Sequence, residues 1–191
     1  MKHSNDTRTA ILDTTQDLVQ RQSISGVSFQ DLADRIGIKK GSMYYHFKSK
    51  DDLSIAMLDR AGQQLKDSFK RGYEKTATNQ LSYFLKIYSE YIGAGTRMCP
   101  GGAYVGEWDK LSNPVKSRVK WLIEIQNKGL KKILAAGVKN DEFETHGMSI
   151  DELALWLVSN LQGALLTSRV VGNKEPFEAI VQVIGRFLQV K

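Results

Sequence analysis

Proline is rare in this chain, and that scarcity is the feature that most limits the folds it can adopt. The 191 residues contain only three prolines, so long stretches have no helix-breaking residue. Within these stretches apolar positions recur at helical rather than alternating spacing, as in Ile11, Thr15, Leu18 and Val19. The pattern predicts an all-α fold of about nine helices.

The composition is that of a folded, basic protein. Hydrophobic residues make up 41% and charged residues 25%, and the net charge of +6 favours a polyanion such as nucleic acid or anionic lipid. The one cysteine, Cys99, rules out an intrachain disulfide and fits a reducing compartment. The polar start resembles no signal peptide and no apolar run spans a membrane, so we expect a soluble cytoplasmic protein.

Capping residues divide the N-terminal part of the chain into short helices. A first helix ends at the break "SISGVS", where Gly26 is the expected turn residue. Ser28 begins an S-x-x-D sequence that predicts the start of a second helix, which ends at Gly37. A third helix is predicted over about residues 40–46, and Ser49 opens a longer fourth one.

The rest of the chain is also predicted to be helical. "QLSYFLKIYSEYI" has an apolar, aromatic face, and "GAGTRMCPGG" then interrupts the pattern. Asn113, followed by Pro114, predicts the N-cap of a long helix. After the loop "GVKNDEFETHGM", two final helices are expected at about 150–171 and 175–190, separated by Gly172.

Two short helices joined by "GIKK" suggest a helix-turn-helix, in which the second helix enters the major groove of DNA. In "KKGSMYYHF" the spacing directs Met43 and Phe47 to the core and Ser42, Tyr45 and His46 outward. A tyrosine can pack on sugar while its hydroxyl donates to a phosphate. Nearby lysines add the salt-dependent attraction that dominates DNA affinity: Lys39, Lys40, Lys48 and Lys50.

Gly41 leaves room for close approach of the backbone to DNA. The alternative is that Tyr44 and Tyr45 belong partly to the core and that the lysines are an ordinary solvated surface. Spacing alone leaves both interpretations open.

The stretch "SFQDLADRIGIKKGSMYYHFKSKDDL" resembles the N-terminal signature of the TetR family of bacterial transcriptional repressors. That signature is similar to T-x-x-x-I-A-x-x-x-G-V-S-x-G-x-[LI]-Y-x-[HY]-F-x-[ST]-K-[ED]-x-L, and the resemblance covers residues 7–55. The matching residues are Ser28, Leu32, Ala33, Gly37, Ile38, Gly41, Met43, Tyr44, Phe47, Lys50 and Leu53.

The resemblance implies a set of DNA contacts. Ser28 and Tyr44 would contact phosphate, and Lys50 would meet the DNA backbone at the start of the next helix. The residues expected to face the groove are Lys40, Ser42, Tyr45 and His46. Lys39 departs from the family, which commonly has Ser or Thr there, so the recognition helix loses a capping hydroxyl.

The resemblance also implies two domains. Residues 1–50 would bind DNA, and residues 51–191 would bind a small molecule and form a homodimer, with residues 50–72 as a connecting helix that tilts on ligand binding. The expected dimer is a four-helix bundle of the last two helices from each chain. Its candidate interface residues are Leu157, Leu161, Ala164, Leu165, Ile180 and Ile184. An ordinary core position is the alternative for each of them.

A ligand site is predicted around "YSEYIGAGTRMCPGGAYVGEW", where aromatic rings with hydroxyl groups adjoin a break between helices. The candidate residues are Tyr88, Tyr91, Met98, Cys99, Tyr104 and Trp108. An aromatic stripe at helical spacing is also typical of a core. "MCPGG" resembles a subgroup in which cysteine often stands here and some members sense electrophiles or oxidants, whereas a lone cysteine is usually a small buried hydrophobe.

These patterns predict a homodimeric repressor that a small molecule of unknown identity releases from a palindromic operator. The alternatives are a repressor that senses electrophiles through Cys99 and a dimeric DNA-binding protein that senses nothing. Enzymatic activity is not expected, because Cys99 and His146 lie in separate loops without a supporting motif. No metal-ligand spacing or phosphate-binding glycine loop occurs, so no metal, cofactor or catalytic residue is predicted. A membrane-surface role is disfavoured because the lysines occupy a short turn motif.

Overall fold

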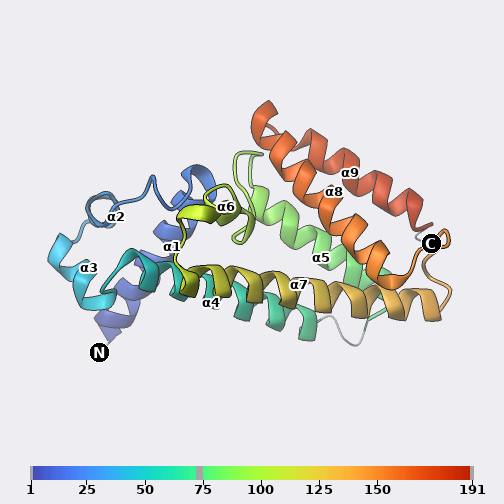
Figure 1. Cartoon of the computed structure of the whole chain (residues 1–191), viewed down its shortest axis with the longest axis horizontal. Helices are drawn as coiled ribbons and strands as arrows, with labels where there is room; N and C mark the ends of the chain where they lie inside the picture. Colours follow the sequence, from blue (N-terminus) through green and yellow to red (C-terminus); the bar gives the residue numbers. More distant parts are fainter. Residues whose placement is uncertain (1, 72–74, 190–191) are drawn as a thin grey trace. The chain divides into compact units, whose positions relative to one another are not determined.

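The computed structural model describes residues 2–71 and 75–189, with side chains from residue 6 onward. These residues form helices and connecting loops without a strand, which confirms the predicted all-α fold (Figure 1). The elements are α1 Lys2–Gln22, α2 Phe29–Ile36, α3 Lys40–His46, α4 Lys50–Arg71, α5 Ala77–Ile92, α6 Gly102–Val105, a 3-10 turn η1 Trp108–Lys110, α7 Asn113–Lys139, α8 Ile150–Val171 and α9 Glu175–Phe187.

The chain divides into two compact units. The first comprises Met1–Gly62 with Pro100–Leu122, and the second comprises Gln63–Cys99 with Ile123–Lys191. The short helix α6, which periodicity did not predict, belongs to the first unit together with η1. The functional boundary expected at residue 50 stays a prediction, and residue 72 of the expected connecting helix lies outside the described residues.

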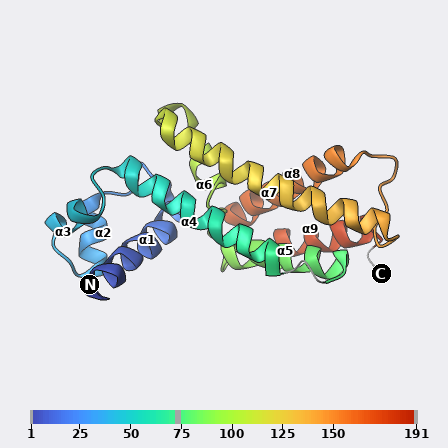
Figure 2. The ribbon, with the colours of Figure 1, turned by 90° about the horizontal axis from the view of Figure 1, so that it is seen from below.

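The first unit is built on α1, α2 and α3, and Figure 2 shows α2 and α3 packed beside α1. Its core contains Ile11, Leu32, Met43 and Met57, all without exposed surface. These side chains come from four different helices, so burying them holds α3 in place although seven residues are too few for a stable isolated helix.

The turn between α1 and α2 differs from the prediction. Ser23, and not Gly26, adopts the left-handed conformation, with φ of 68°. Gly26 is required for another reason, since a Cβ atom there would lie 2.9 Å from the carbonyl oxygen of Gln22. The backbone of α1 passes so close to this turn that a larger residue would displace it.

In the second unit α8 and α9 run side by side and antiparallel (Figure 1). The backbone N–H of Phe177 in α9 donates to the hydroxyl of the buried Ser168 in α8 over 3.1 Å. Phe177 also stacks on Tyr88 of α5, with ring centroids 6.5 Å apart. The three helices therefore share one core.

The start of α7 lies one residue earlier than predicted. Asn113 is already helical, and the backbone N–H of Val115 points to the hydroxyl of Ser112 at 3.5 Å. Ser112 therefore takes the N-cap position that we assigned to Asn113, and proline falls in the first helical turn as expected. None of the described helices carries an apolar stretch long enough to cross a membrane.

Candidate DNA-binding surface

Helix α2 begins at a complete capping box. The Ser28 hydroxyl accepts the backbone N–H of Asp31 at 3.1 Å, and the Asp31 carboxylate accepts the backbone N–H of Ser28 at 3.0 Å. Hydrogen bonds to the Asp31 carboxylate, first from the Ser28 side chain and then from the Ser28 backbone N–H, hold the pKa of Asp31 below its ordinary value. Ser28 is exposed at the start of α2.

Helix α3 separates its side chains as predicted. Met43 is fully buried and Phe47 is 3% exposed, whereas Tyr45 is 80% exposed and Tyr44 is 53% exposed. The Tyr44 ring rests against Phe29 of α2, with centroids 5.1 Å apart, so the ring is held while about half of it remains accessible. Tyr45 is therefore not a core residue, whereas Tyr44 belongs partly to the core through its contact with Phe29.

The polar candidates lie around the same helix. Ser42 and His46 are half-buried, and the edge of the Tyr45 ring contacts the His46 ring at a centroid distance of 5.1 Å. Four lysines are exposed: Lys39, Lys40, Lys48 and Lys50. A Cβ atom on Gly41 would meet no atom within 4 Å, so this face of α3 is open to a ligand.

The start of α3 confirms the loss of a capping bond. Lys39 occupies the N-cap position in an extended conformation, and its side chain makes no capping hydrogen bond. The first N–H groups of α3 therefore lack a side-chain acceptor from Lys39.

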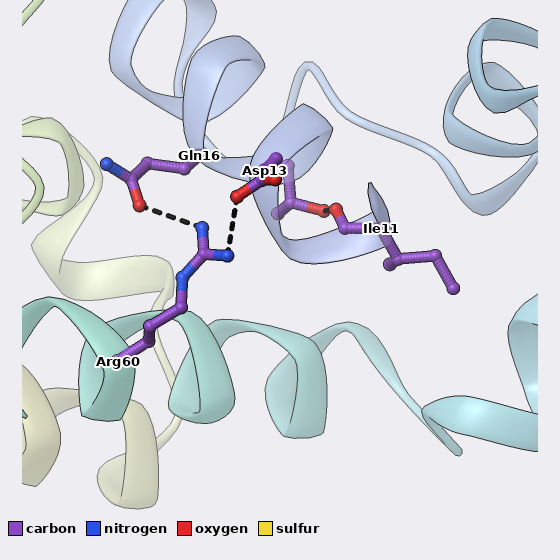
Figure 3. Close-up of polar contacts among 5 residues, drawn as sticks. Ile11, Asp13, Gln16 and Arg60 are labelled. Carbon is purple, nitrogen blue, oxygen red and sulfur yellow. Dashed lines mark hydrogen bonds and ion pairs between the residues drawn. The ribbon is translucent and has the colours of Figure 1, made fainter. Parts of the chain in front are cut away.

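Polar contacts hold α4 against α1 within the first unit. The guanidinium of Arg60 on α4 donates to the Asp13 carboxylate at 2.6 Å and to the Gln16 amide oxygen at 3.0 Å (Figure 3). A guanidinium that reaches two acceptors on one helix limits rotation as well as separation. Sequence periodicity did not identify this clamp, because its members are more than forty positions apart.

The predicted ligand residues are divided between the two units. Tyr88, Tyr91, Met98 and Cys99 belong to the second unit, but Tyr104 and Trp108 belong to the first. Tyr104 is fully buried with its hydroxyl 3.9 Å from the Met57 sulfur, and burial raises its pKa.

Trp108 has different neighbours again. The ammonium groups of Lys116 and Lys120 each lie 5.9 Å from the centre of its ring. Two of the six predicted ligand residues are therefore occupied with contacts inside the first unit.

Cys99 is buried in a polar cluster. Its sulfur lies 3.2 Å from the amide nitrogen of Gln162, which also donates to the Tyr88 hydroxyl at 3.3 Å. Burial raises the pKa of Tyr88, and it raises that of Tyr91 to about 12. Because Cys99 is only 5% exposed, its environment favours the buried-hydrophobe interpretation over an electrophile sensor.

The predicted dimer residues are mostly core residues of a single chain. Leu157, Leu161, Leu165 and Ile184 have no exposed surface, and Ala164 is 4% exposed. A second chain cannot contact side chains that are already enclosed, so these assignments are wrong for the four large residues. Helical spacing does not indicate which face of a helix is buried, and in the structure α8 and α9 bury the face that carries these residues.

The outward face of α8 and α9 carries the apolar surface that we assigned to the wrong residues. It includes Leu155, Leu166, Val170 and Val183, which are 68%, 57%, 82% and 40% exposed. The same two helices line an open groove of about 480 Å³. Its lining is Ser159, Asn160, Gly163, Ala164, Thr167, Pro176, Ala179 and Ile180.

Among the described residues no group of three or more His, Cys, Asp or Glu side chains is arranged to hold a metal ion. The candidate site is the exposed surface formed by the start of α2, by α3 and by the lysines in and beside α3.

Two family models match this chain. One is described as "Bacterial regulatory proteins, tetR family" and matches residues 11–57, and the other is described as "Tetracyclin repressor-like, C-terminal domain" and matches residues 77–184. The first match contains the whole helix-turn-helix, and the second contains α5 to most of α9.

Curated relatives are similar over most of their length. The HTH-type transcriptional repressor DhaR of Mycobacterium sp. (strain GP1) is 26% identical over 174 residues, covering 89% of this chain and 85% of DhaR. The HTH-type transcriptional repressor NemR of Escherichia coli (strain K12) is 26% identical over 182 residues, covering 87% and 89%.

Solved structures have the same fold. A TetR-family regulator from Agrobacterium tumefaciens has a TM-score of 0.89 at 20% identity, covering 97% of this chain and 98% of that one. A TetR regulator from Legionella pneumophila has a TM-score of 0.79 at 26% identity, covering 95% and 96%. Together with the exposed recognition helix, these matches show that the chain belongs to the TetR family of bacterial DNA-binding transcriptional regulators.

Proposed function

We propose that this protein is a homodimeric repressor that binds a near-palindromic operator and releases it when a small molecule occupies the second unit. We expect it to work in the cytoplasm, where the bacterial chromosome lies. The observation that carries the DNA-binding part is the face of α3, which exposes two tyrosines among four lysines.

The chemistry of that face suits double-stranded DNA. The lysines neutralise phosphates and release counterions, while Tyr44 and Ser28 each offer a hydroxyl that can donate to a phosphate oxygen. Tyr45 and His46 lie where a recognition helix meets base edges. The protein's net charge of +6 adds long-range attraction.

A dimer is supported by the outward surface of α8 and α9. Leu155, Leu166 and Val170 are exposed on one helix, next to a groove lined largely by small side chains. Contiguous exposed apolar surface of this kind marks a protein interface, and small residues allow helices to approach closely. Two recognition helices must also span half-sites about 34 Å apart, which one chain cannot do.

The effector site belongs to the second unit in this proposal. A pocket there, lined by Phe69, Tyr83, Phe84 and Ile133 among others, has a volume of only about 10 Å³, which is room for about one water. An effector must therefore displace side chains to enter. Such a displacement is a means of changing the regulatory unit.

The decisive experiment is selection of random duplex DNA by the purified protein, followed by sequencing of the bound pool. We expect enrichment of a two-fold symmetric site, which then serves as the probe for screening small molecules that release it at a fixed salt concentration. Binding that only falls as salt rises, without enrichment, would refute specific recognition. Enrichment without release by any compound would instead leave a DNA-binding dimer that senses nothing.

A further inference from the structure

The Glu107 side chain joins two segments of the first unit that are far apart in the sequence. Its carboxylate accepts the Ser23 hydroxyl at 2.5 Å, the Ser25 hydroxyl at 2.6 Å and the Ser25 backbone N–H at 3.2 Å. Both carboxylate oxygens are used, and these bonds, that from Ser23 first, hold the pKa of Glu107 below its ordinary value. The carboxylate is therefore charged at neutral pH and binds one turn of the chain.

That turn is strained and leads directly to the DNA-binding surface. Ser23 ends α1 with φ of 68°, a conformation that usually selects glycine and is costly for a residue with a Cβ atom. Ser28, the N-cap of α2 and a candidate phosphate contact, follows only three residues after Ser25. A turn in a costly conformation needs contacts from outside to hold it.

The segment that carries Glu107 is itself anchored. Tyr104, three residues earlier, is fully buried against Met57 of α4. Arg118, near the start of α7, forms an ion pair of 2.9 Å with Asp59 of α4. Glu107 thus extends from a segment fixed on α4 to the turn before α2.

We propose that Glu107 is a positioning residue for DNA recognition, whose carboxylate holds the Ser23–Ser25 turn so that Ser28 and the start of α2 meet the phosphate backbone. This inference rests on the proposed function. It adds a residue outside the helix-turn-helix that acts on DNA affinity without touching DNA.

The test compares Glu107→Ala with Asp109→Ala. Asp109 is exposed and lies two residues after Glu107, so the second variant removes the same charge without the contacts to the turn. The probe is the duplex that the wild-type protein selects from random DNA, measured by fluorescence anisotropy at fixed salt. We expect Glu107→Ala to bind about tenfold more weakly, the effect of losing hydrogen bonds to a charged group. Asp109→Ala should bind equally or more tightly, because removing a negative charge favours a polyanion.

Two further measurements separate positioning from a general loss of structure. In a Ser28→Ala background the loss caused by Glu107→Ala should shrink, since the carboxylate acts through the placement of Ser28. Amide hydrogen exchange without DNA should become faster at residues 23–31 in Glu107→Ala and stay unchanged in the core of α1. If Glu107→Ala does not fold, Ser25→Ala removes one donor and should shift affinity and exchange in the same direction by less.

Unchanged exchange at residues 23–31, additive losses in the double variant, or equal affinities for the two alanine variants would each overturn the inference. Failure of the wild-type protein to select any duplex would instead refute the proposed function. The exchange measurement still decides in that case whether Glu107 holds the Ser23–Ser25 turn, because it needs no DNA.

Discussion

Helices α3 and α8 both expose large side chains, but they expose different chemistry. The seven-residue α3 presents tyrosines whose rings end in hydroxyl groups, surrounded by lysines. The 22-residue α8 presents leucine and valine side chains with no polar atom. The first surface suits a charged, hydrated partner such as DNA, and the second suits another apolar surface. Exposure alone does not predict a partner, whereas the chemistry of the exposed atoms does.

Helix α8 has an inner, buried face and an outer, exposed face. Leu161→Ala removes a fully buried side chain and should lower the free energy of unfolding by about 2–5 kcal/mol. Leu155→Ala deletes the same atoms from a position that is 68% exposed in the single chain, and at a protein concentration low enough to keep the chain monomeric it should cost less than about 1 kcal/mol. Urea unfolding at one protein concentration measures both, and equal losses would mean that the two faces are not distinct.

A charge on the outer face tests whether it is the dimer surface. Leu166→Glu places a carboxylate in the proposed interface and should weaken the dimer by about 2 kcal/mol, roughly thirtyfold in dissociation constant, while helix content is retained. Sedimentation equilibrium measures the change. Ile123→Glu, at an exposed apolar position of α7, is the matched control and should leave association unchanged. A dimer that tolerates Leu166→Glu would place the interface elsewhere.

On α3 we expect binding of the partner to depend on a hydroxyl group rather than on apolar surface. Tyr44→Phe keeps the ring that packs on Phe29 but removes the hydroxyl, and operator binding should weaken by about 1 kcal/mol. Tyr83→Phe, which removes an exposed hydroxyl from α5, should have no effect on operator binding. Anisotropy titrations with the selected duplex measure both variants, and unchanged affinity for Tyr44→Phe would show that its hydroxyl contacts no phosphate.

The smallest expected effect concerns acid stability in the second unit. The Glu142 carboxylate accepts the backbone N–H groups of Ala77 at 3.1 Å and Thr78 at 2.8 Å, and these bonds, that from Thr78 first, lower its pKa from 4.5. A lowered pKa in the folded state contributes stability above pH 4.5, and this contribution is lost as the pH falls through the lowered value. Glu142→Gln should therefore flatten the acid side of the stability profile.

Thermal unfolding between pH 3 and 7 measures this slope, with Glu144→Gln as the control at a nearby exposed position. An identical slope in wild type and Glu142→Gln would mean that the carboxylate does not cap α5 in solution.

The sequence predicted the DNA-binding surface far better than the regulatory half. Met43 and Phe47 are buried and Tyr45 is exposed, as their spacing indicated, and Ser28 caps α2. These features depend on residues within a few positions of one another. The predicted interface leucines of α8 were wrong because α8 is apolar on more than one face, so periodicity identifies a helix without telling which face turns inward.

What the sequence determined by itself is therefore local: a helical chain with few breakers, the capping box at Ser28, and a short helix whose tyrosines and lysines share one side. The tertiary structure decided which leucines of α8 face solvent, that Cys99 is enclosed, and that Glu107 meets the turn at Ser23. The physical reason is the separation along the sequence over which each interaction acts. Backbone hydrogen bonds and caps act between neighbouring residues, whereas burial and the pairing of distant polar groups depend on how whole helices pack.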